Sequence, residues 1–166
     1  MRQLVKNGWL FCQTTIAPSP PSIIGPIFRD DELTTTPDFL RLAGVLKSRA
    51  QSRKLARMTL IRATAKAALL TLGHVRSSRS PHHHIGHDIG FAEVVVFLKR
   101  TQPEQYLELR VEDILPSELI SGFLPDAVTK VGNLPRVIEF GGDYDTKRLR
   151  IIHDACHAKG VGYDLY

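Results

Sequence analysis

LPDAVTKVGNLPRVIEFGG, residues 124–142, contains two short runs rich in β-branched and apolar residues. The runs are 126–131 and 137–140, and Gly132 with Asn133, a pair typical of tight turns, lies between them. The pattern predicts two neighbouring antiparallel strands. Each run carries an acid, Asp126 or Glu139, so this segment is also the expected location of a functional site.

The elements on either side extend this strand pair into an α/β domain. Residues 82–100 have helical spacing of apolar side chains, and residues 106–111 predict a further strand. Asp145 can cap a second helix that ends at Gly160, and the run 162–166 predicts a last strand. The predicted order is helix, three strands, helix, strand, over a domain that spans residues 81–166.

Residues 1–80 predict a second, basic region with less regular structure. The opening residues resemble a last helical turn that runs into a strand, and Thr36 followed by Pro37 predicts the start of a helix that ends near Gln51. Three further elements are expected: a strand at 11–17, a short strand at 58–63 and a helix at 64–72.

Positive charge is concentrated in one segment. No Asp or Glu occurs between Asp38 and Asp88, whereas this gap holds ten Lys and Arg residues and leaves twelve basic and seventeen acidic residues elsewhere. A field of this kind attracts polyanions through phosphate neutralisation, although a solvated helix face is the simpler alternative. DNA is therefore the expected partner. The residues expected to contact it are Arg49, Arg53, Lys54, Arg57, Arg62 and Lys66.

The cysteines and the apolar stretches indicate the compartment. Cys12 and Cys156 lie far apart, no secretory hydrophobic segment precedes the first of them, and the longest apolar stretches are shorter than the roughly 20 residues of a membrane span. A cytoplasmic protein without a membrane contact is expected. Cys156 shares the apolar side of its predicted helix with Leu149 and Ile152, which indicates a packing role.

The element order is similar to the conserved core of the PD-(D/E)XK, or restriction-nuclease-like, superfamily. Pro125-Asp126 opens the second strand and Glu139 lies in the third, as that motif requires. The resemblance implies that Asp126 and Glu139 bind Mg²⁺, which activates water for phosphodiester cleavage. The lysine expected two residues after the Glu is replaced by Gly141, so the motif is incomplete. Lys147, in the first turn of the next helix, is the candidate substitute.

Short motifs in order along the chain carry a narrower resemblance. They are Leu4-Val5-Lys6-Asn7-Gly8-Trp9-Leu10, His87-Asp88-Ile89-Gly90, Leu124-Pro125-Asp126-Ala127, Ile138-Glu139-Phe140-Gly141-Gly142 and the closing residues 160–166. In these the chain resembles the plasmid replication-relaxation proteins, which join a winged-helix DNA-binding domain to a nuclease-like domain. The resemblance implies an N-terminally truncated member that retains a winged-helix remnant, namely the end of the recognition helix and the wing.

Three functions follow from these patterns. The favoured one is a DNA-binding protein of plasmid or mobile-element replication and maintenance with a degenerate nuclease-like domain. The alternatives are an active Mg²⁺-dependent endonuclease and a non-enzymatic interaction domain, because a fold does not fix a function. A zinc site formed by His83 and His87 is the weaker interpretation of the histidine run, since adjacent histidines point apart and no Cys lies nearby.

Overall fold

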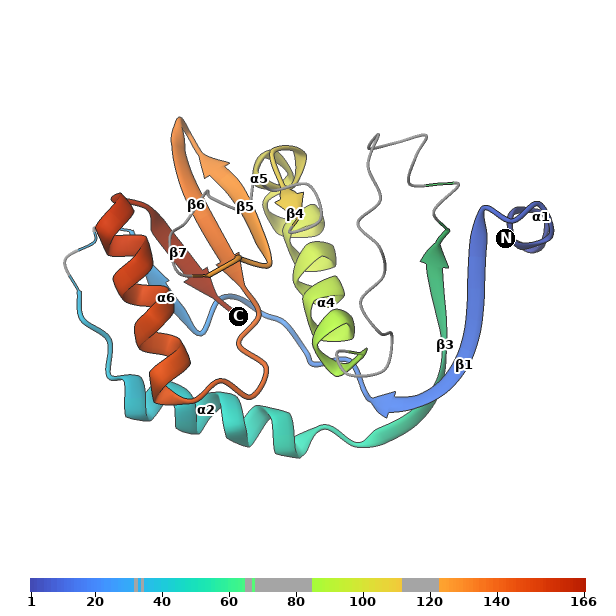
Figure 1. Ribbon diagram of the computed structural model, residues 1–166, viewed down its shortest axis with the longest axis horizontal. Coiled ribbons are helices and arrows are strands. Elements are labelled where there is room, and N and C mark those ends of the chain that lie inside the picture. Colours follow the sequence, from blue (N-terminus) through green and yellow to red (C-terminus); the bar gives the residue numbers. More distant parts are fainter. Residues whose placement is uncertain (32, 34, 65–66, 68–84, 112–122) are drawn as a thin grey trace.

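The computed structural model describes residues 1–31, 33, 35–64, 67, 85–111 and 123–166, which form a mixed α/β structure (Figure 1). Its larger sheet has five strands in the order β2-β7-β6-β5-β4. Strands β6 and β7 are parallel, and the other neighbours are antiparallel. The strands are β2 (Phe28–Asp30), β4 (Arg110–Val111), β5 (Ala127–Val131), β6 (Leu134–Glu139) and β7 (Gly162–Leu165).

Helices cover both faces of this sheet. The long helices that lie on these faces are α2 (Phe39–Ser52), α4 (Ile85–Thr101) and α6 (Thr146–Lys159). Successive residues of a strand point to opposite faces, so Ile138 of β6 packs with Leu98 of α4, and Val137 packs in the cluster that contains Ile152 of α6. The core therefore lies in two layers, one on each side of β6.

The second half of the chain follows the predicted order, with one difference. Residues 106–111 were expected to form a strand, but α5 (Pro103–Leu107) occupies the first part and only the two residues of β4 pair with β5. Pro103 explains the difference because it stands in the first turn of a helix, where its fixed φ is favourable and its missing N–H costs nothing. The predicted strand is therefore too long.

Helix α2 begins later than the sequence indicates. The expected cap was Thr36, but Asp38 is the N-cap and its carboxylate accepts a 3.0 Å hydrogen bond from the backbone N–H of Arg41. Helix α6 has the caps that were predicted. Asp145 accepts a bond from the Arg148 N–H, and Gly160 ends the helix with φ +63°.

The N-terminal residues form an arm that extends from the sheet (Figure 1). After α1 (Arg2–Lys6), β1 (Leu10–Pro18) pairs along its whole length with β3 (Leu55–Ala63) as an antiparallel ribbon. The base of the arm is attached to α4, because Ala17 packs with Ile85 and Ile89. Most of the helix expected at residues 64–72 lies outside the described residues.

Two elements of the N-terminal half belong to the main core. Strand β2, which the sequence did not indicate, pairs with β7 across more than half of the chain, and Leu46 of α2 packs with Leu149 and Leu165. Residues from both sides of the predicted boundary at residue 80 thus share one sheet and one core. Helix α2 connects the two parts, because Leu46 packs in this core and the chain runs from the end of α2 into β3 of the arm.

Candidate functional site

The two predicted acids meet at the ends of neighbouring strands. The antiparallel register pairs Ala127 with Ile138, which places Asp126 and Glu139 opposite each other one residue further along. The Asp126 backbone N–H donates to Glu139 Oε1 at 3.1 Å, and the Phe140 N–H donates to Asp126 Oδ2 at 2.8 Å. We call Asp126 and Glu139 the acid pair.

Glu139 is completely buried, and its surroundings favour the protonated carboxyl. Its side chain has 0% exposure, and the Tyr144 hydroxyl donates to its Oε2 at 3.0 Å. Burial raises the pKa of Glu139 well above its ordinary value, and the charge of Asp126 adds to this effect. Glu139 therefore keeps its proton to a higher pH than a solvated glutamic acid would.

His87 of α4 is the third member of this site. Its Nε2 lies 3.2 Å from Asp126 Oδ2 and 3.1 Å from the Phe140 carbonyl oxygen. Burial lowers the pKa of His87, but the hydrogen bond and charge of Asp126, the charge of Asp88 and the hydrogen bond to Phe140 together raise it overall. Since a carbonyl oxygen only accepts, Nε2 carries a proton in this arrangement and serves as a donor.

Gly141, the position where a lysine was expected from the resemblance, is closed by packing. Gly141 is buried, and a Cβ added to it would lie 2.5 Å from Leu46 Cδ2 and 3.2 Å from Leu165 Cδ1. Any side chain at this position would therefore have to push aside the terminal methyl groups of Leu46, and of Leu165 to a smaller extent. Lys147 is exposed to solvent, whereas its neighbour Arg148 lies over the Phe123 ring and its charge acts on Glu139. Arg148 is the cation that the structure brings toward the acid pair.

Protein groups donate hydrogen bonds to most of the carboxylate oxygens of the acid pair. Three of its four carboxylate oxygens accept hydrogen bonds from Asp126 N–H, Phe140 N–H and the Tyr144 hydroxyl. A metal ion would have to replace some of these bonds and would favour the ionised form of Glu139, against the raised pKa of its carboxyl. Mg²⁺ at this pair stays a prediction.

The cations expected to contact DNA fall into three groups. Arg49 and Arg53 have internal partners: Arg49 donates to the Tyr166 carbonyl oxygen at 2.7 Å, and Arg53 donates to the Ser19 carbonyl oxygen at 2.7 Å. Burial, and secondarily the charge of Arg53, lowers the pKa of Arg49 to about 10. By contrast, Lys54 and Arg57 are exposed. The Arg62 side chain and Lys66 lie outside what the structure describes.

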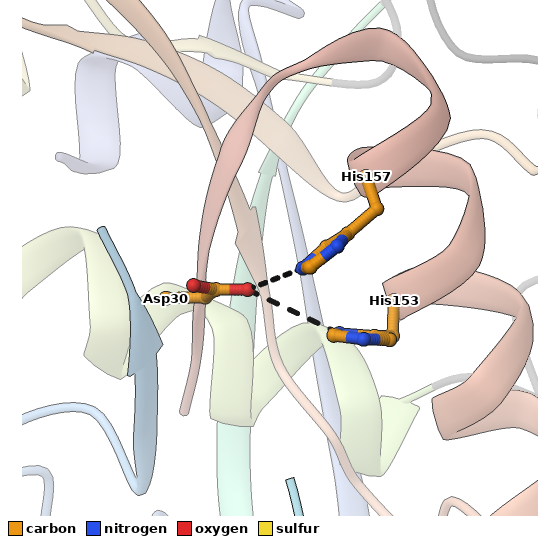
Figure 2. A group of neighbouring side chains, drawn as sticks. All are labelled: Asp30, His153 and His157. Carbon is orange, nitrogen blue, oxygen red and sulfur yellow. Dashed lines mark hydrogen bonds and ion pairs between the residues drawn. The ribbon is translucent and has the colours of Figure 1, made fainter. Parts of the chain in front are cut away.

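A second polar cluster, which the sequence interpretation missed, joins β2 to α6 (Figure 2). His157 Nε2 lies 2.7 Å from Asp30 Oδ2, and His153 Nδ1 lies 4.0 Å from the same oxygen. His153 also shares a 3.1 Å hydrogen bond with the Tyr163 hydroxyl. Burial, and secondarily the charge of His157, lowers the pKa of His153. We call Asp30, His153 and His157 the Asp-His-His cluster.

The sequence contained half of the signal for this cluster. His153 and His157 are separated by four residues on a helix that was predicted correctly, so their rings had to share one face. Asp30 could not be found in the same way, because it reaches the helix only through the unexpected pairing of β2 with β7.

Cys156 has the packing role that was predicted for it. Its side chain is completely buried among Val137, Ile152 and Tyr163, and burial raises the pKa of the thiol to about 12. A thiol in this state is a poor nucleophile at neutral pH.

Comparison of the chain with known proteins finds no match to a protein-family model, to a curated protein or to a solved structure. Among the described residues, none of the helices combines the length and apolar character that crossing a membrane requires. The site must therefore be interpreted from its own geometry.

Proposed function

We propose that this chain is a DNA-binding protein of plasmid or mobile-element replication and maintenance, with a nuclease-like domain that does not cut DNA. The observation that carries this proposal is the packing of Leu46 and Leu165 against Gly141. The position that would hold the lysine beside Glu139 is filled by leucine methyl groups, so the centre lacks the lysine that helps to stabilise charge during cleavage and has only the more distant charge of Arg148.

The arrangement of elements supports the nuclease-like part of the proposal. Helix α4, strands β4 to β6, helix α6 and strand β7 follow one another in the order of the resembled core, and the acid pair lies at adjacent ends of β5 and β6. At the N-terminus, α1 leads into β1, as the end of a recognition helix would lead into a wing, but the partner strand β3 follows only after α2.

The exposed cations of the arm support the DNA-binding part. Lys54 and Arg57 are exposed near the start of β3, and Arg41 and Lys47 are exposed on α2. Lysine and arginine in such positions can neutralise phosphates without reading the bases. Because the short α1 is the only helix among the described residues of the arm, we expect binding to duplex DNA to be weak and tolerant of sequence.

A salt titration of duplex binding tests this part. The affinity should fall linearly on a logarithmic scale as salt rises, and replacing both Lys54 and Arg57 by Ala should reduce the slope by roughly 1.8, about 0.9 for each phosphate contact. Arg100 and Lys159, which are also exposed, give the matched control. Equal losses from both double variants, or an affinity independent of salt, would contradict the proposal.

Cleavage of supercoiled plasmid with Mg²⁺ or Mn²⁺ separates the proposal from an active endonuclease. The acid pair and His87 are the observation in favour of that alternative. We expect no nicking by the unmodified protein. Nicking that disappears in Glu139→Gln would establish the endonuclease instead, and a lack of DNA affinity even at low salt would favour an interaction domain.

A further inference from the structure

We propose that Asp30, His153 and His157 form a binding site for a transition-metal ion of the zinc type. The two histidines of this Asp-His-His cluster lie in the middle and in the last turn of α6, away from the first turn that carries Lys147, and the cluster shares no residue with the acid pair. The inference is independent of the proposed DNA-binding function.

The backbone places the three ligands on one side of the sheet. His153 and His157 are one helical turn apart on α6, and their ring centroids are 3.9 Å apart. Asp30 ends β2, where it pairs with Tyr163 of β7. Figure 2 shows both imidazoles directed toward the carboxylate. One ligand atom of each side chain lies within 4.8 Å of the others.

These distances suit a small tetrahedral ion. Zinc binds nitrogen and oxygen ligands at about 2.0 to 2.1 Å, which puts two tetrahedral ligand atoms about 3.3 Å apart. The distances of 2.7 Å and 4.0 Å from Asp30 Oδ2 to His157 Nε2 and His153 Nδ1 lie on either side of that value. Small rotations of the side chains would therefore produce the geometry.

Burial gives a reason for a cation at this position. The Asp30 side chain is 1% exposed, and a buried carboxylate is costly unless a positive charge or several hydrogen bonds compensate it. Its contacts are His157 Nε2 and the backbone N–H of Leu33, which donates at 2.9 Å. A divalent ion would supply the charge, and the hydrogen bond of His153 with Tyr163 would be exchanged for a bond to the metal.

The donor set selects the class of metal. Two imidazoles and one carboxylate suit Zn²⁺ and its neighbours, whereas Mg²⁺ and Ca²⁺ prefer oxygen ligands. Three protein ligands leave one position for water. An ion could enter from solvent, because the His157 side chain is 27% exposed and His153 lines a surface groove between the first turns of α2 and α6.

The test measures metal binding to the full chain after removal of metal with a chelator. His82, His83 and His84 are first replaced by Ala, because this histidine run, outside the described residues, would bind the same ions. Equilibrium dialysis with Zn²⁺ or Co²⁺ should then give one ion per chain. Co²⁺ should show the intense visible absorption of tetrahedral coordination, and Mg²⁺ should not compete.

Two variants locate the ion. His157→Ala and Asp30→Asn should each weaken Co²⁺ binding at least tenfold and abolish the tetrahedral absorption. His87 provides a matched control, since its side chain has an exposed fraction of 28% against 27% for His157, so His87→Ala should bind like its parent. Zn²⁺ should also raise the Tm of the parent, and not that of His157→Ala, by about 5 °C or more at saturation.

The proposal fails if the parent binds no Co²⁺, if His157→Ala binds as tightly as the parent, or if His87→Ala loses the ion equally. Circular dichroism of each variant separates loss of a ligand from loss of the fold. If Asp30→Asn does not fold, His157→Ala decides alone. In the case of failure, the Asp-His-His cluster is a hydrogen-bonded link between β2 and α6.

Discussion

At the residue scale, the raised pKa of Glu139 predicts how stability depends on pH. A carboxyl whose pKa is raised by folding stabilises the native state fully below its unfolded pKa and loses that contribution as pH rises toward the folded pKa. The loss is at most about 1.4 kcal/mol for each pH unit. Glu139→Gln does not titrate and retains groups that can bond to Tyr144, so its stability relative to the parent should increase from about pH 4.5 upward.

Urea unfolding at several pH values measures this difference. Glu108→Gln serves as the control, because the Glu108 side chain is 51% exposed and lies far from the acid pair in the sequence. Parallel stability curves for the parent and Glu139→Gln would show that Glu139 is ionised in the native protein.

The contact at Gly141 gives a second prediction at this scale. Gly141→Ala should destabilise the fold by about 1 to 3 kcal/mol, because its Cβ would lie 2.5 Å from Leu46 Cδ2 inside a packed core. Gly44 is exposed on α2 with no atom within 4 Å of an added Cβ, so Gly44→Ala should stabilise by about 0.5 to 1 kcal/mol. Changes in the free energy of unfolding with the same sign at both positions would contradict this account.

At the element scale, sequence predicted the segments whose signals are local. The caps Asp145 and Gly160 mark α6, and alternating residues around Gly132 mark β5 and β6. Because the acid pair depends only on this hairpin, the sequence could also predict that Asp126 and Glu139 lie next to each other. The sequence could not show that Arg148, and not Lys147, is the cation whose charge acts on the acid pair. That outcome depends on which side of the first turn of α6 faces the sheet.

Strand β2 shows why the remainder could not be predicted. Its three residues carry no pattern of their own. They form a strand only because Tyr163 to Leu165 of β7 offer an unpaired sheet edge, and the paired residues Arg29 and Asp164 are 135 positions apart in the sequence. That pair consists of a bidentate contact between Arg29 and the fully buried Asp164, which Arg136 also contacts. Long-range pairing of this kind depends on the assembled core, and the Asp-His-His cluster depends on it in turn.

The start of α2 is open to a direct test. Asp38→Ala should lower the free energy of unfolding by about 1 kcal/mol, because it removes the acceptor for the Arg41 N–H. Thr36→Ala, at the cap that the sequence indicated, should change it by less than about 0.5 kcal/mol. Chemical denaturation of the two variants compares them, and a larger cost for Thr36 would place the helix start earlier than the structure does.

At the scale of the whole molecule, Arg53 connects the arm to the core. Its guanidinium donates to the carbonyl oxygens of Pro18, Ser19 and Gly86, and therefore ties the end of β1 to the start of α4. Burial lowers the pKa of Arg53. A side chain expected to contact DNA thus holds three segments of the protein together.

Arg53→Ala should therefore loosen the arm without unfolding the sheet. Hydrogen exchange should accelerate roughly tenfold or more at amides of β1 and of the first turn of α4, while β6 keeps its protection. Lys54→Ala removes a neighbouring exposed charge and should leave exchange unchanged. Equal acceleration in β6 would mean that the arm and the sheet open as one cooperative unit.

The contact between Leu46 and Gly141 also bears on how such a chain evolves. Gly141→Lys on its own would force a long side chain into filled space, and Leu46→Ala on its own would leave a cavity beside Leu149 and Leu165. Each step is harmful without the other, so the two positions are epistatic. A lysine could therefore arise at this position only through an intermediate of lower stability, so selection for a stable fold keeps the glycine in place.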